Sequence, residues 1–255
     1  MVGAHRTQLY SVAAIVLFIL GWAFLSRNAD PTLLPSPMLT WKTFVELVGN
    51  GTLESSISIS LWRVLSGWIL GSVIAIPLGI LAGTSRIARA VIDPFIHFFR
   101  FVPALALISL FLLWFGIGEA SKVYLIAYAV AFIVVVNTAT GAASVPADKV
   151  NAVRCLGASR ARAIWSVIIP ASVPYIFTGM RLGLANAFLV LVAVEALATQ
   201  SGIGFLIWNA RTYFLTDEIF VGILCFGLLG FTGDRLWKLL GSMVLRRYLR
   251  SSGEY

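Results

Sequence analysis

The residues of this sequence that could do chemistry are few, and they form no catalytic or metal-binding set. The two histidines, His5 and His97, lie far apart and have no neighbours at the spacing of metal ligands, so no metal site is expected. The sequence contains no paired acids, no HExxH motif and no nucleophile with a base beside it. Cys155 and Cys225 fall in a basic segment and an apolar run, so no disulfide is expected between them. The sequence therefore predicts a protein that is not an enzyme and holds no cofactor of its own.

The polar residues that stand out lie within or beside long apolar stretches. Glu195 lies in LVLVAVEALA, and a carboxylate in such a setting usually faces a cavity or a charged partner. Two roles stay open for it, a cavity or gate residue paired with Arg63 or a structural link between helices. Arg63 would suit an anionic ligand, although its position also fits a side chain that reaches to the membrane surface. Asn137 and Asn186 either line a path through the protein or hydrogen-bond between helices.

The composition indicates that these residues belong to a membrane protein. The 255-residue chain is 59% hydrophobic and 12% charged, whereas about a quarter of the residues are charged in a typical soluble domain. The mean hydropathy is +0.92. Long unbroken apolar stretches, without the short alternation of outer-membrane barrels, predict an all-α, polytopic membrane helix bundle. The net charge of +8 fits the basic cytoplasmic loops of membrane proteins, and we expect no nucleic-acid partner.

Six transmembrane helices are predicted, and the distribution of charge sets their orientation. Basic residues gather in both terminal tails and in the loops after the second and fourth spans. The positive-inside rule therefore places both termini in the cytoplasm. The first span could instead be a cleaved signal peptide, which would leave the orientation of the others unchanged. The predicted spans are about 9–25, 61–83, 101–116, 123–145, 177–198 and 219–240.

The cytoplasmic loop at 146–170 carries a helical pattern of its own. In NAVRCLGASRARAIWSVIIP, apolar residues follow steps of three and four, as on one face of a helix. Gly157 interrupts the pattern, and glycine readily takes the left-handed conformation that ends a helix. Ser159 is a candidate N-cap for a second helix. The pattern predicts helix, bend and helix, either as a knob that fits a groove in another protein or as a helix resting on anionic lipid.

The spacing in this loop resembles a motif of bacterial ABC importer permeases: Glu-Ala-Ala, three residues, Gly, nine residues, Ile-x-Leu-Pro. Asn151, Ala152 and Val153 occupy the first three positions, Gly157 is the glycine, and Pro170 ends the motif at the same interval. FVPALALISLFLLWFGIGEASK and VAVEALATQSGIGFLIWNAR help to extend the resemblance over nearly the whole chain from about residue 33. It is closest to permeases for taurine, aliphatic sulfonates, nitrate and bicarbonate. The chain departs from the family at Asn151, which stands where the glutamate is usual.

The resemblance implies a type I ABC importer permease of the bacterial inner membrane, with one permease domain over residues 1–255. In that family the 147–169 loop is the coupling helix, which docks into a separate ATPase. The sequence has no GxxxxGK[ST] loop, so ATP and Mg²⁺ would bind on that partner. The residues assigned to ATPase coupling are Asn151, Ala152, Arg154, Gly157, Ala158, Ser159 and Arg160.

The implied activity is import of a small anionic solute. The implied partners are a second copy of the chain, two ABC ATPase subunits, a periplasmic or lipid-anchored solute-binding protein, and membrane lipid. The alternative is a secondary transporter or channel that acts without an ATPase. That alternative requires a relay of buried charges, for which Glu195 alone offers little.

Overall fold

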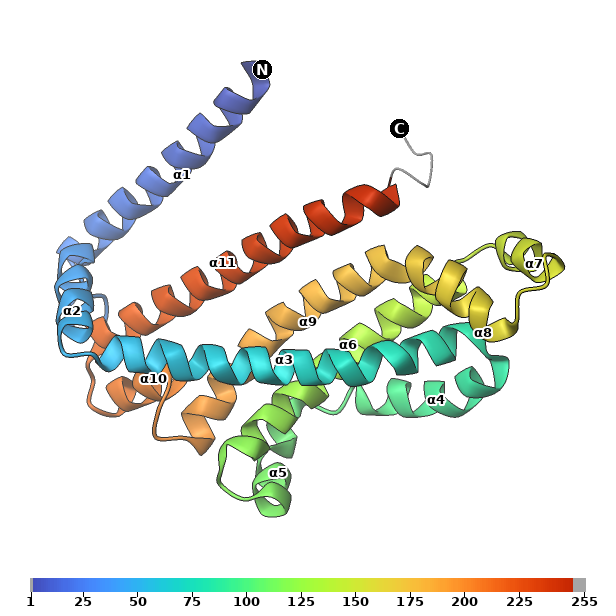
Figure 1. Ribbon diagram of the computed structural model, residues 1–255. Coiled ribbons are helices and arrows are strands. Elements are labelled where there is room, and N and C mark those ends of the chain that lie inside the picture. Colours follow the sequence, from blue (N-terminus) through green and yellow to red (C-terminus); the bar gives the residue numbers. More distant parts are fainter. Residues whose placement is uncertain (1, 250–255) are drawn as a thin grey trace.

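The computed structural model describes residues 2–249 of the chain, and this range is helical with no β-strand, which confirms the all-α prediction (Figure 1). Short helices at both ends of the bundle connect longer ones. The elements in chain order are α1 (Val2–Arg27), α2 (Pro37–Gly49), α3 (Thr52–Thr84), α4 (Arg86–Phe99), the 3-10 helix η1 (Ala104–Leu107), α5 (Ile108–Phe115), α6 (Glu119–Ala143), α7 (Ala147–Cys155), α8 (Arg160–Ala163), the π-helix η2 (Ile164–Ile168), α9 (Ile169–Ala198), α10 (Ile203–Thr212) and α11 (Thr216–Leu249).

Four helical stretches are long and apolar enough to cross a membrane, and each contains most or all of one predicted span. They are Thr52–Thr84, Glu119–Ala143, Arg160–Ala198 and Thr216–Val244. All four exceed the roughly 20 residues that cover the hydrocarbon, so they can tilt or extend beyond it. The first predicted span corresponds to a shorter apolar helix, Val12–Arg27.

The third predicted span, a single helix over 101–116, differs from the structure. Within it the structure has the helical stretch Ala104–Phe115, which is shorter than the roughly 20 residues of a full span and meets the preceding helix, Arg86–Phe99, at an angle of 87°. Pro103 explains the break, because proline donates no backbone N–H and disfavours helical conformation at the residue before it. The segment before it was expected to be a loop because of its arginines, yet the Ser85 hydroxyl accepts a hydrogen bond from the Ala88 N–H and begins α4 there.

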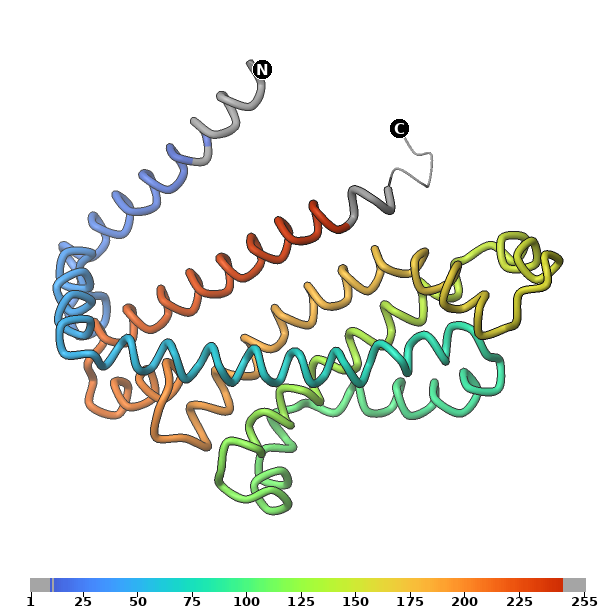
Figure 2. Tube along the Cα trace, in the orientation of Figure 1, coloured from blue at the N-terminus to red at the C-terminus, as the bar shows by residue number. Residues whose placement is uncertain are grey.

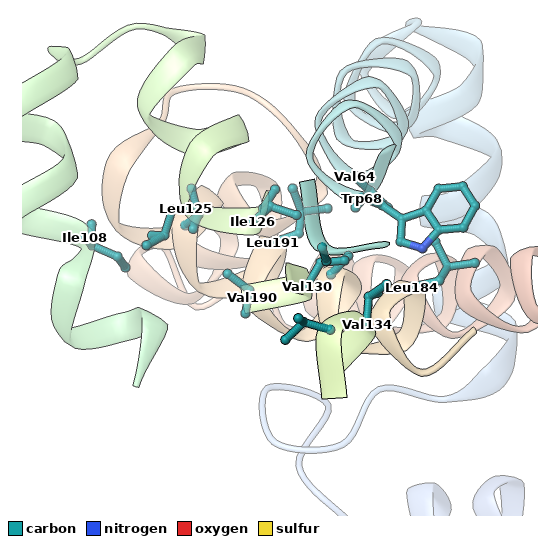
Figure 3. Packing of buried hydrophobic residues seen from close by; sticks show 14 of the residues in the cluster. Val64, Trp68, Ile108, Leu125, Ile126, Val130, Val134, Leu184, Val190 and Leu191 are labelled. Atoms are coloured by element: carbon teal, nitrogen blue, oxygen red, sulfur yellow. The ribbon is translucent and has the colours of Figure 1, made fainter. Parts of the chain in front are cut away.

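The core is the contact between α3, α6 and α9. Buried aliphatic side chains such as Val64, Ile126 and Leu191 fill it (Figure 3). Glycines allow α3 to lie close to α6: a Cβ on Gly71 would come within 2.5 Å of the Ala127 carbonyl oxygen. This contact explains why small residues recur on that face of α3, as they do where membrane helices pack closely.

The two terminal helices lie outside this core. The Cα trace shows α11 running beside α9, with α1 diverging from the bundle (Figure 2). The Trp237 Nε1–H of α11 donates to the Phe177 carbonyl oxygen of α9 at 3.0 Å. Trp22 ties the end of α1 to the rest by stacking on Phe220 and donating to the Pro35 carbonyl oxygen. Most of the side chains of Val12–Arg27 are exposed, which suits contact with lipid or another subunit.

Candidate functional site

Arg63 of α3 and Glu195 of α9 meet at the end of the bundle where α3 begins and α9 ends. The Arg63 Nη1 donates to the Glu195 Oε1 at 2.7 Å, and the two residues are 1% and 0% exposed. Glu119, the first residue of α6, receives hydrogen bonds from Arg63 Nε and Nη2 at 2.7 and 2.8 Å. One guanidinium therefore joins the three core helices. We call this group the Arg63 cluster; its members are Ser60, Arg63, Glu119, Lys122, Glu195 and Ser201.

All five N–H donors of Arg63 are engaged. Besides the two carboxylates, Nη1 donates to the Ser201 carbonyl oxygen at 2.8 Å and Nη2 to the Ser201 hydroxyl at 2.9 Å. Guanidinium has five N–H groups and no acceptor, so no donor is left for an anionic ligand. The side chain turns into the protein, which rules out the alternative that it reaches to the membrane surface. In this conformation Arg63 and Glu195 form a structural link.

A turn wraps the buried Glu195 carboxylate. Oε2 accepts the Gly204 N–H at 2.9 Å, and Oε1 lies 2.8 Å from the Ser60 hydroxyl. The Ser60 oxygen in turn accepts the Ile203 N–H at 3.0 Å. Gly202 has φ +102°, a conformation that favours glycine, and a Cβ on it would overlap the carboxylate. The buried carboxylate is tolerated here because both of its oxygens accept hydrogen bonds and the Arg63 cation balances its charge.

Sequence reasoning considered the Arg63–Glu195 pair but missed the rest of the cluster. The Lys122 Nζ lies 2.7 Å from the Glu119 Oε1, so two cations neutralise two carboxylates. The signal available was an acid and a base three residues apart at the start of an apolar run, a spacing that pairs side chains on a helix. Their link to Arg63 depends on how α6 packs on α3.

At the opposite end of α6, α7 and α8 form the predicted helix, bend and helix, but the second helix does not end at Pro170: it continues without a break into α9. We call residues 147–168 the elbow. Gly157 has φ +87°, and its N–H donates to the Arg154 carbonyl oxygen at 3.0 Å. The Ala158 N–H donates to the Val153 carbonyl oxygen at 3.1 Å, closing the end of α7. The Ser159 hydroxyl accepts the Arg162 N–H at 3.3 Å and begins α8. The roles predicted for Gly157 and Ser159 in the bend are confirmed.

One face of the elbow packs against the bundle, and other side chains of the elbow are exposed. Ile168 packs with Ile80 of α3 and Ala142 of α6. Leu156 and Trp165 are 87% and 72% exposed. The assigned coupling residues Asn151, Ala152, Arg154, Gly157, Ser159 and Arg160 are exposed, and Ala158 is half-buried. The Arg160 Nη2 contacts the Thr84 carbonyl oxygen at 3.4 Å, a long bond to the end of α3.

Asn137 and Asn186 line a cavity of about 480 Å³, bounded by α6, α9 and the turn between α4 and η1. The Asn186 Nδ2 donates to the Ala129 carbonyl oxygen at 3.0 Å, which links α9 to α6. The Asn137 Nδ2 donates to the Ile133 carbonyl oxygen of its own helix at 2.8 Å. The structure thus brings these two predicted pathway residues together and leaves Arg63 and Glu195 outside the cavity wall. Within residues 2–249, no group of three His, Cys, Asp or Glu side chains is placed to hold a metal ion.

Comparison with known proteins agrees with this architecture. Residues 75–246 match the family described as "Binding-protein-dependent transport system inner membrane component". A probable ABC transporter permease of Brucella melitensis is 43% identical over 216 residues, which cover 85% of this chain and 87% of that one. The taurine transport system permease of Escherichia coli K12 is 34% identical over 240 residues, or 92% and 86% of the two chains.

Among solved structures, an inward-facing methionine ABC transporter shares the fold with a TM-score of 0.62 at 18% identity. The similarity covers 74% of this chain and 95% of that one. The match confirms the ABC importer permease fold that the sequence predicted.

Proposed function

Since the chain belongs to the family of binding-protein-dependent transport system inner membrane components, we propose that it imports a small anionic solute as the permease of an ATP-driven importer. The taurine permease of Escherichia coli, similar over 92% of this chain, supports a sulfonate-like substrate. The 480 Å³ cavity supports an anion as well, because no carboxylate lines it. Of the candidate solutes (sulfonates, taurine, nitrate and bicarbonate), we favour sulfonates including taurine, because several similar permeases are named for them.

We propose that the elbow transmits the work of a separate ATPase. Its exposed Leu156 and Trp165 are apolar side chains that water does not favour, and exposed Arg154 adds a charge that could pair with an acidic rim. The positive φ of Gly157 gives the elbow a defined bend instead of a loose loop. ATP and Mg²⁺ would bind to the partner, because this sequence contains no phosphate-binding loop.

The proposed assembly contains two copies of this chain, two ATPase subunits and a solute-binding protein on the side of the Arg63 cluster. Both termini would lie in the cytoplasm with the elbow, as the basic residues of the tails and of the 146–170 loop indicate. The chain itself would do no chemistry. The exposed apolar residues of α1 would face lipid or the second copy.

The single observation that carries this proposal is a bent, exposed elbow fixed to a helix bundle of the family fold. The test is ATP-dependent uptake of a radiolabelled alkanesulfonate into liposomes that contain the permease, its ATPase and its binding protein. Uptake should stop when the ATPase is omitted. Uptake by the permease alone, driven by an ion gradient, would establish the secondary transporter. The Arg63 cluster argues against that alternative, since Glu195 is paired with Arg63 and held by hydrogen bonds from three partners, which favour a fixed, ionised carboxylate.

A further inference from the structure

A second cavity lies next to the first on α6. Its volume is about 490 Å³, and its wall is formed by α4 and the C-terminal half of α6. The two cavities share Val136, which lines both of them. We call the first the amide cavity, after Asn137 and Asn186, and the second the α4–α6 cavity. The residues of the second are Arg89, Asp93, Ile96, His97, Val136, Ala139, Thr140, Ala143 and Ser144.

The two cavities follow one stripe of α6, distinct from the stripe that packs against α3. Residues 133, 136, 137, 140 and 144 lie at helical spacings of three and four and line one or both cavities. The α3-facing stripe is different: Val130 and Thr138 approach the glycines of α3. The cavity stripe becomes more polar toward the elbow, where it ends in Thr140 and Ser144. A polar stripe exposed along a membrane helix suits a water-filled route better than lipid.

Helix α4 supplies the opposite wall of the second cavity. Arg89, Asp93 and His97 recur every four residues, so they share one face of α4, and all three line the cavity. The Arg89 Nε donates to the Ala82 carbonyl oxygen at 3.1 Å, which fixes the start of this side chain near the end of α3. Three titratable groups on one face, turned toward a polar stripe, are unexpected for a helix that only packs against its neighbour.

The amide cavity has a different wall, partly aromatic and partly amide. Phe99, Tyr128 and Phe132 contribute rings, and Arg100 lies at the turn between α4 and η1. Each asparagine uses Nδ2 once, in a hydrogen bond to a carbonyl oxygen, so a primary amide keeps a second N–H to offer. Aromatic faces accommodate a hydrocarbon group, whereas amide and guanidinium N–H groups suit an anion.

We propose that the two cavities form one route along α6, which an anion with a nonpolar body enters at the two asparagines and leaves past α4. A bare inorganic anion would exchange its full hydration shell for a wall that is mostly apolar and partly aromatic, and would gain less there. The route deepens the proposed function and rests on it. Val136, common to both cavities, marks the passage between them.

Thiol labelling tests the route directly. Asn186→Cys and Thr140→Cys place one thiol in each cavity, in a chain that also carries Cys155→Ser and Cys225→Ala. Sulfonatoethyl and trimethylammonioethyl methanethiosulfonate, an anionic and a cationic reagent of similar size, are applied to the permease and ATPase in lipid vesicles. The control is Leu189→Cys, which is 72% exposed on α9 and lines neither cavity. The labelling rate of each cysteine with each reagent is divided by the rate at which the same reagent labels a small thiol in solution, so that differences in intrinsic reactivity cancel.

Both cavity positions should react faster than Leu189→Cys. Asn186→Cys should prefer the anionic reagent, by on the order of tenfold, because Arg100 lines its cavity and a charged wall raises the local concentration of ions of opposite sign. Thr140→Cys should show a smaller preference, because the Asp93 carboxylate lines its cavity together with Arg89. Failure of either position to react above the control rate, or of Asn186→Cys to prefer the anionic reagent, would overturn the inference.

A second arm blocks the passage in the complete importer. Val136→Trp should lower alkanesulfonate uptake by at least about tenfold, the effect of a barrier raised by about 1.4 kcal/mol, while Val136→Ala transports. Leu189→Trp, outside both cavities, should transport like the parent chain. Normal uptake by Val136→Trp at normal abundance would refute the route and leave the proposed function standing. Lack of ATP-dependent uptake by the parent chain would instead refute the proposed function.

Discussion

The Arg63 cluster and the elbow are opposite in construction. The cluster is neutral in total charge, its Arg63, Lys122 and Glu195 are buried, and it ties α3, α6 and α9 together at one end. The elbow, at the other end of α6, exposes Leu156 and Trp165 and contacts α3 through one long hydrogen bond and an apolar face. Because the Arg63 cluster holds α3, α6 and α9 together, a force that a partner applies to the elbow would move these helices as one body. The contrast therefore favours rotation of one whole subunit against another over rearrangement of helices within a subunit.

The largest effect is expected from breaking the cluster. Arg63→Leu leaves the buried Glu195 carboxylate without its cation, and should lower the free energy of unfolding by about 3–5 kcal/mol. Arg181→Leu is the matched control: it breaks an arginine–carboxylate pair with Asp234 whose side chains are 42% and 34% exposed. Such an exposed pair contributes about 0–1 kcal/mol. Thermal unfolding in detergent should separate the two variants, and equal melting temperatures would show that the cluster is not the fixed end.

A smaller effect is expected from crowding the turn around Glu195. A Cβ on Gly204 would lie 2.6 Å from the Glu195 Cβ and 2.8 Å from the Val192 carbonyl oxygen. Gly204→Ala should therefore destabilise the protein by about 1–3 kcal/mol, as overpacking of a core does. Gly227→Ala is the control, since a Cβ at Gly227 meets nothing within 4 Å. If both variants melt like the parent chain, the turn is looser than the structure indicates.

The elbow contains a glycine that is needed for a different reason. A Cβ on Gly157 meets no atom within 4 Å, so only its φ of +87° restricts substitution. Gly157→Val should cost about 1–2 kcal/mol by strain in the bend, and should leave the bundle folded. Uptake per ATP hydrolysed should fall, because the bend would no longer present the same face to the ATPase. Unchanged coupling in a variant of normal abundance would mean that the bend does not transmit force.

The smallest effect is expected from the N-cap of α8. Ser159→Ala removes the acceptor of the Arg162 N–H and should cost about 1 kcal/mol, confined to the elbow. Amide hydrogen exchange measured by mass spectrometry should be faster than in the parent chain over α8 and unchanged around Arg63. Faster exchange across the whole bundle would contradict the independence of the two ends.

The sequence was sufficient where the decisive interactions are local. The bend at Gly157 and the cap at Ser159 depend on residues within a few positions of each other, and both were predicted. The break at Pro103 also has a local cause, but the apolar run on either side of it favoured a single span. α4 was missed because its arginines interrupt the apolar pattern that marks a membrane helix.

The remaining features depend on packing between helices. Glu119 joins Arg63 across 56 residues of chain, and nothing near either residue in the sequence requires that contact. Likewise, the segment that holds Arg89 and His97 falls between two predicted spans, and the cavity that they line exists only because α4 folds back along α6. Asn137 and Asn186 were recognised as polar groups in apolar spans, but their common cavity required the fold.

The most direct test of the account is to cross-link the elbow to its partner. Cys155 is exposed in the elbow and becomes the only cysteine after Cys225→Ala, so a photoactivatable maleimide can be attached there. In vesicles that contain a transport-competent complex, we predict that Cys155 cross-links to the ATPase subunit and that the yield changes when ATP is added. Cross-links to lipid alone, in a complex that transports, would contradict the claim that the elbow receives the work of the ATPase.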